Sequence, residues 1–65
     1  MPMEISLRAA RINAGYTQKS AAHELEINKN TLASYENYNT IPDVEMAQRI
    51  AALYGVSINS IKWSA

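Results

Sequence analysis

The stretch from residue 28 to residue 36 carries side chains suited to hydrogen bonding rather than to covalent chemistry. At helical spacing, its outward side combines one ammonium group, a carboxamide and hydroxyls: Lys29, Asn30, Thr31 and Ser34. Its other side carries Leu32, Tyr35 and Glu36. A carboxamide such as that of Asn30 can donate to and accept from adenine, and Lys29 can reach guanine or phosphate. The pattern is typical of a helix that hydrogen-bonds to base edges in a major groove.

A second helix is predicted directly before this stretch. Thr17 is a suitable N-cap, and Ser20 is placed to help close the first turn. Small apolar residues then form an inner face: Ala21, Ala22 and Leu25. The chain breaks at Glu26, Ile27 is the apolar plug of the turn, and Asn28 caps the next helix. Two short helices joined by so tight a turn predict a helix-turn-helix over residues 17–36.

The rest of the chain predicts further helices packed around this motif. Helical spacing and capping residues indicate one helix over residues 4–13, one from Asp43 to about residue 54, and a short one that Ser57 caps. Gly15 and Gly55 mark helix ends, and a loop over residues 37–41 ends at Pro42. We therefore expect an all-α fold, a compact five-helix bundle that forms a single domain over residues 1–65.

The composition of the chain argues against several classes of function. The chain has no cysteine, and His23 is its one histidine, so neither disulfides nor a metal site is expected. No nucleophile has a base at a plausible spacing, and there is no Gly-rich phosphate loop, so we expect no enzyme and no cofactor. No apolar run approaches the roughly 20 residues that span a bilayer, and no secretory signal is evident. A cytoplasmic protein without membrane contact is expected.

The charge balance argues for weak binding by one copy. Six Lys and Arg residues balance six Asp and Glu residues, at a pI of about 6.5, whereas nucleic-acid binders are often strongly basic. Three acids are expected at helix starts, where they favour the helix dipole: Glu4, Asp43 and Glu45. Lys19 and Lys29 lie in the first turns of the two motif helices. A modest electrostatic attraction to DNA follows.

Over residues 6–61 the sequence resembles the Cro/C1-type (XRE-like) helix-turn-helix domain of phage repressors and small bacterial regulators. The matching residues are Leu7, Arg11, Gly15, Thr17, Gln18, Ala22, Leu25, Ile27, Leu32, Tyr35, Glu36, Asn37, Pro42, Ile50, Ala51, Tyr54, Val56 and Ile61. The resemblance implies a lambda-repressor-like bundle with helices two and three as the motif. Glu26 and Tyr38 stand where the family usually has glycine, at a cost of roughly 1 kcal/mol for a left-handed position.

The resemblance also implies roles for individual residues. Gln18 would clamp a phosphate and brace the recognition helix, while Arg11 and Glu36 would form a partly buried structural ion pair. Independently of the resemblance, the position of Asn37 and Tyr38 just after the recognition helix would let their amide and phenol reach backbone phosphate, although Tyr38 is equally suited to packing. The full set of expected DNA-binding residues is Thr17, Gln18, Lys19, Asn28, Lys29, Asn30, Thr31, Ser34, Asn37 and Tyr38.

Two functions fit these patterns. The first is a sequence-specific regulator of transcription that binds a double-stranded, palindromic DNA operator as a homodimer. The dimer contact would come from residues 58–63, from the loop over residues 38–41, or from a separate domain beyond Ala65. Trp63 suits either this contact or a lid on the core. The second is a protein-interaction module of the same fold, antitoxin-like or antirepressor-binding, which the near-neutral charge favours. The polar face of the second motif helix favours the first function more strongly.

Overall fold

Each α-helix of the chain begins at a residue whose side chain accepts a hydrogen bond from a backbone N–H of the first turn. The computed structural model describes residues 4–65, so the first three residues of the expected domain lie outside the described residues. The capping residues are Ser6, Thr17, Asn28 and Asp43. They start α1 (Leu7–Asn13), α2 (Gln18–Leu25), α3 (Lys29–Glu36) and α4 (Val44–Tyr54). The two motif helices and their tight turn are thus as the sequence predicts.

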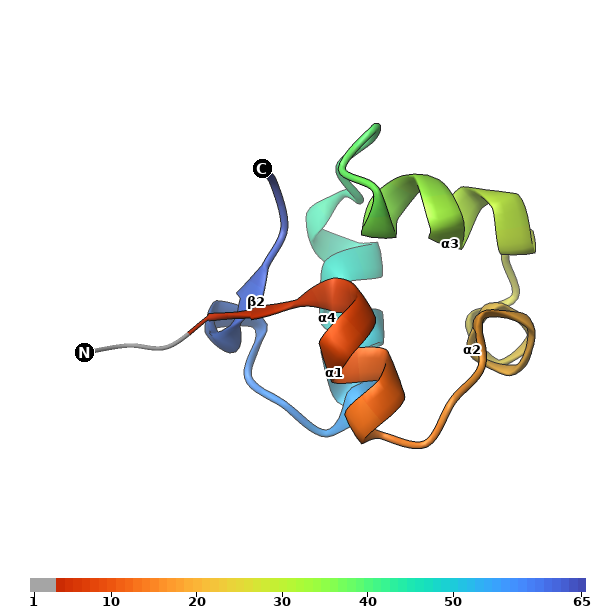
Figure 1. The fold of residues 1–65 in the computed structure, drawn as a ribbon, viewed down its shortest axis with the longest axis horizontal. Coiled ribbons are helices and arrows are strands. Elements are labelled where there is room, and N and C mark those ends of the chain that lie inside the picture. The colour runs from red at the N-terminus through yellow and green to blue at the C-terminus, as the bar shows by residue number, and fades with distance from the viewer. Residues whose placement is uncertain (1–3) are drawn as a thin grey trace.

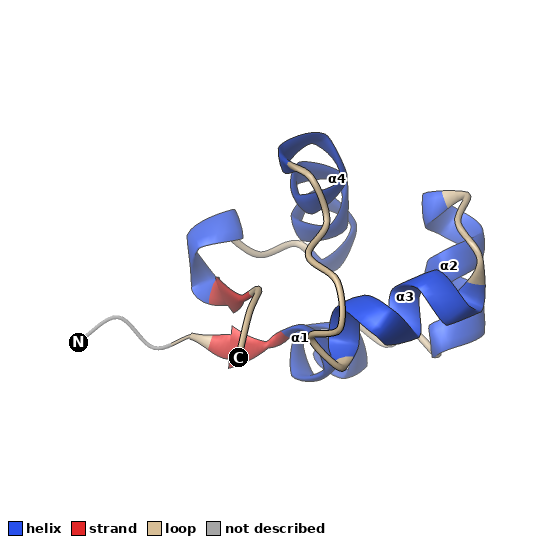
Figure 2. Ribbon diagram, turned by 90° about the horizontal axis from the view of Figure 1, so that it is seen from above, coloured by secondary structure: helices blue, strands red, loops and turns tan. Residues whose placement is uncertain are grey.

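The expected five-helix bundle is wrong at the two ends of the chain. Residues 4–65 form four α-helices, one 3-10 turn, η1 (Ile58–Ser60), and two short parallel strands, β1 (Ile5–Ser6) and β2 (Ile61–Lys62). Ile5 pairs with Ile61, and this pairing holds both residues in extended backbone. Local periodicity cannot reveal a pairing between distant segments. Figures 1 and 2 show the strands at one end of the molecule and α2 at the other.

The N-terminal boundary also corrects the role expected for Glu4. Because Ser6 accepts a hydrogen bond from the Ala9 amide at 3.0 Å, α1 begins at Leu7. Glu4 therefore precedes β1, and the first turn of α1 contains no acidic residue. Asp43 caps α4, and Glu45 lies in its first turn, as expected.

The core lies where the four α-helices and β2 meet. Its largest fully buried side chains are Leu7, Leu32, Ile50 and Ile61. These four come from α1, α3, α4 and β2. Smaller residues of α1 and α2 allow close approach to them: Ala10, Ala21 and Ala22. The motif is therefore held by the same apolar core that joins the chain ends, and no helix of residues 4–65 is long and apolar enough to cross a membrane.

The two positions at which family members usually carry glycine both adopt left-handed backbone. Glu26 has φ 58° at the C-cap of α2, and Tyr38 has φ 62° in the turn after α3. An L-residue there costs roughly 1 kcal/mol relative to glycine. The chain keeps both turns and bears this strain, so the departures in sequence leave the motif geometry in place.

Candidate nucleic-acid interface

The start of α3 presents its polar side chains outward. Lys29 and Asn30 are exposed, whereas Thr31 and Ser34 are half-buried. Asn28 is also exposed, and its Oδ1 accepts a hydrogen bond from the Asn30 amide at 2.7 Å. Its carboxamide oxygen therefore caps the helix, while its amide nitrogen makes no hydrogen bond within residues 4–65.

The start of α2 lies beside this surface. Thr17 and Ser20 form a reciprocal capping box, with the Ser20 amide 3.0 Å from the Thr17 hydroxyl oxygen and the Thr17 amide 2.9 Å from that of Ser20. Lys19 is exposed, whereas Gln18 is half-buried and donates from Nε2 to Glu36 Oε1 at 3.0 Å. The cap fixes the N-terminus of α2, and Gln18 links it to the end of α3.

Arg11 and Glu36 come together beneath this surface. Arg11 Nε lies 2.7 Å from Glu36 Oε2, and the two side chains are only 9% and 3% exposed. Arg11 also donates from Nη1 to the backbone carbonyl of Tyr16 at 2.8 Å. Arg11 of α1 therefore contacts both Glu36 of α3 and the segment that leads into α2. One polar network thus positions both motif helices.

A polar hollow of about 580 Å³ opens over this network. Residues of α1, α3 and the start of α2 line it: Arg8, Arg11, Tyr16, Thr17, Gln18, Lys29, Glu36 and Asn37. Asn37 is exposed at its edge, whereas Tyr38 is half-buried and does not line it. The hollow brings together four of the ten expected DNA-binding residues and Arg11–Glu36, and its cationic rim suits a phosphate group.

Arg8 is a residue of this hollow that the sequence reasoning missed. It is exposed on α1 and makes no hydrogen bond or ion pair with any residue in 4–65. The sequence spacing could have indicated Arg8, because it precedes Arg11 by three residues and therefore lies on the same side of the helix. It adds a second exposed cation to a rim that already holds Lys29, whereas Arg11 lies beneath the rim and is paired with Glu36.

Comparison with known proteins agrees with this geometry. A family model described as helix-turn-helix matches residues 7–61. The chain belongs to the Cro/C1-type helix-turn-helix family. It is 45% identical over 51 residues to the HTH-type transcriptional regulator ImmR of Bacillus subtilis strain 168, a match that covers 78% of this chain. The chain spans 40% of that regulator's length. No solved structure matches it significantly.

This family consists of DNA-binding domains of transcription regulators and is not typically enzymatic. His23 is exposed on α2, and the described part of the chain has no cluster of three His, Cys, Asp or Glu side chains that could hold a metal.

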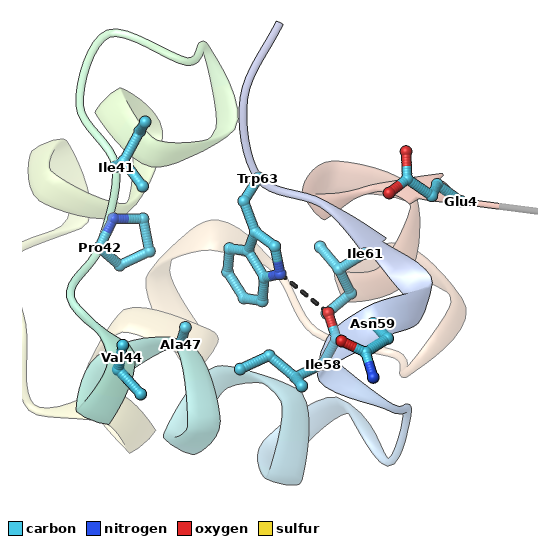
Figure 3. Close-up of a pocket in the computed structure, with 9 residues that line it drawn as sticks. All are labelled: Glu4, Ile41, Pro42, Val44, Ala47, Ile58, Asn59, Ile61 and Trp63. Carbon is cyan, nitrogen blue, oxygen red and sulfur yellow. Dashed lines mark hydrogen bonds between the residues drawn. The ribbon is translucent and has the colours of Figure 1, made fainter.

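A second hollow, of about 400 Å³, lies at the other end of this helix-turn-helix domain, beside the strands (Figure 3). Its lining is mainly apolar: Glu4, Ile41, Pro42, Val44, Ala47, Ile58, Asn59, Ile61 and Trp63. The indole of Trp63 lies between Pro42 and Ile58, and its Nε1 donates to the carbonyl oxygen of Ile58 at 2.9 Å. We call this hollow the Trp63 groove. The loop before α4 and the C-terminal segment both line this groove.

Proposed function

We propose that this chain is a sequence-specific regulator of transcription that binds double-stranded DNA with α3 in the major groove. The observation that carries the proposal is the exposed polar start of α3 beside the polar hollow. Family membership and a relative named as a transcriptional regulator support it. Residues 1–65 would act as one DNA-binding domain in the cytoplasm, without membrane contact, cofactor or metal.

The residue roles follow from exposure and chemistry. Asn30 and Ser34 would contact base edges, since a carboxamide and a hydroxyl can each donate and accept; Thr31 flanks them, and Lys29 would reach guanine or phosphate. Phosphate contacts would come from the rim of the hollow and the start of α2: Arg8, Thr17, Gln18, Lys19, Asn28 and Asn37. Tyr38 follows α3 and lies outside the hollow, and we also propose it as a contact to the phosphate backbone of the DNA.

Near-neutral charge is compatible with this function because the charges are not evenly placed. The Glu36 carboxylate is buried against Arg11, so this pair adds little to the field outside the protein. Asp43 and Glu45 lie at the start of α4, outside the polar hollow. Arg8, Lys19 and Lys29 remain exposed along the proposed interface. The expected result is a small number of phosphate contacts and weak binding by a single copy.

We further propose a homodimer on a palindromic operator of two half-sites, with the Trp63 groove as the contact between copies. The sequence suggested two dimer segments, residues 38–41 and 58–63, and both contribute to this groove. Ile41 and Val44 at its edge are 65% and 72% exposed. A two-fold interface uses the same patch on both copies, so one apolar groove can serve both sides of the contact.

The first test is fluorescence anisotropy with duplex DNA. Operator selected from a random library should bind more tightly than random duplex, and Asn30→Ala or Ser34→Ala should cost about 1–3 kcal/mol while relaxing preference at one base position. Absence of binding to any duplex at low salt would instead support the protein-interaction module. Unchanged operator affinity in both variants would overturn the assignment of the α3 face.

The second test separates dimeric from monomeric binding. Footprinting should protect two half-sites about one helical turn apart, with cooperative onset. Val44→Lys, in the Trp63 groove, should abolish the cooperativity, as should Trp63→Ala. Ile12→Lys is the matched control, because Ile12 is 55% exposed on α1 and does not line the groove. A short protected patch with a one-to-one isotherm in the parent chain would refute the dimer.

A further inference from the structure

The Glu36 carboxylate is divided between the protein core and the proposed DNA-binding surface. Its Oε2 accepts from Arg11 Nε at 2.7 Å. Its Oε1 accepts from Gln18 Nε2 at 3.0 Å, while Arg11 Nη2 lies farther from the same oxygen, at 3.4 Å. Each oxygen therefore has its own principal partner, and the partner of Oε1 is the first residue of α2.

This contact decides which way the Gln18 carboxamide faces. An ionised carboxylate only accepts hydrogen bonds, so a glutamine that contacts it must present its amide nitrogen and not its oxygen. One Nε2 hydrogen is then used by Glu36. The second Nε2 hydrogen and Oε1 of Gln18 are left for other partners at the polar hollow that this side chain lines. A phosphate, which accepts hydrogen bonds, is a suitable partner for that second N–H.

We propose that Glu36 is a positioning residue for DNA binding, which holds Gln18 in the orientation that presents an N–H to a backbone phosphate. The inference rests on the proposed DNA-binding function. A glutamine side chain that is ordered on binding loses rotamer entropy. Glu36 removes much of that cost in the free protein, because Glu36 is itself held by Arg11 in a site where its side chain is 3% exposed. The ion pair thus serves recognition as well as folding.

The free protein offers a direct test, with Gln48 as a matched control. Gln18 and Gln48 are the two glutamines of the chain, and Gln48 is exposed on α4 with no side-chain hydrogen bond within residues 4–65. NMR relaxation of the two side-chain amide groups should show Gln18 to be clearly more ordered than Gln48. If both are equally mobile, Glu36 does not preorganise Gln18. This measurement needs no variant, so it cannot fail through misfolding.

A double-mutant cycle on DNA affinity tests the functional step. Glu36→Gln keeps the size of the side chain and removes its charge; in the parent background it should weaken operator binding about 3- to 30-fold. In the Gln18→Ala background the same change should weaken binding less than about 2-fold, because there is no longer a side chain to position. Equal losses in both backgrounds, with folding verified by circular dichroism, would overturn the inference and leave the proposed function intact. If the parent chain binds no duplex at low salt, the proposed function and the inference both fall.

Discussion

Arg49 of α4 donates a hydrogen bond from Nη2 to the carbonyl oxygen of Leu25, the last residue of α2, at 3.0 Å. The same nitrogen lies 3.8 Å from the Glu26 carboxylate. Carbonyls at the end of a helix lack partners within the helix, so Arg49 satisfies one of them from a different element. Arg49 thereby links the turn between α2 and α3 to α4.

Replacing Arg49 by methionine should loosen this turn. The change keeps an apolar stem but removes the guanidinium group, so we expect a loss of about 1 kcal/mol in unfolding free energy and faster amide exchange around Glu26 and Ile27. Arg8→Met is the control, because Arg8 makes no hydrogen bond or ion pair within the described residues. Identical urea midpoints for the two variants would contradict a role of Arg49 in holding the turn.

Removing the Glu36 carboxylate should destabilise the domain much more than removing an exposed one. Glu36→Ala strands the buried Arg11 guanidinium, at a cost of roughly 3–5 kcal/mol. Glu24→Ala and Glu45→Ala remove exposed carboxylates that form no ion pair in residues 4–65, and should shift the urea midpoint little. If the three variants unfold at the same urea concentration, the buried pair makes no special contribution.

The exposed cations of the proposed interface should determine the salt dependence of DNA binding. Each of Arg8→Ala, Lys19→Ala and Lys29→Ala should reduce the slope of log affinity against log salt by about one, and a cation that contacts only phosphate should weaken binding to all sequences alike when it is removed. Lys62→Ala is the control, since Lys62 is exposed on β2 and does not line the polar hollow. A slope that falls for Lys62→Ala as much as for the other three would place the interface elsewhere.

Tyr54 should make the domain sensitive to alkali. Its hydroxyl is buried without a hydrogen-bond partner in the described residues, and burial, with Glu36 nearby, raises its pKa from 10.0 to about 12. The unfolded chain therefore loses this proton at lower pH than the folded one, so stability should be intact below pH 10 and fall between pH 10 and 12. The part of this alkaline loss that belongs to Tyr54 is measured by comparing the parent chain with a Tyr54 variant.

Tyr54→Phe should remove part of this alkaline loss, of order 1–2 kcal/mol, and at pH 7 it should be neutral or slightly stabilising because it removes an unpaired hydroxyl. Tyr38→Phe is the control, since Tyr38 is half-buried in a turn at the surface. Urea unfolding at pH 7, 9 and 11 gives the comparison. The explanation fails if the Tyr54 variant and the Tyr38 variant lose the same stability between pH 9 and pH 11.

The sequence by itself determined the features that short-range contacts build. Thr17 and Asn28 cap helices through hydrogen bonds that span three residues or fewer, so their types and spacing place the motif helices correctly. The family pattern identified the turns after α2 and α3, and Glu26 and Tyr38 are left-handed there. The polar face of α3 likewise follows from helical period alone.

Only the tertiary structure decided what distant segments do together. The pairing of Ile5 with Ile61 replaced two predicted helical ends by strands, because its hydrogen bonds join segments at opposite ends of the chain. The hydrogen bond between Gln18 and Glu36 depends on how α2 packs against α3. The Trp63 groove exists because the loop before α4 meets the C-terminal segment. Local propensity and spacing carry no information on such contacts, since each one is fixed by the packing of the whole core.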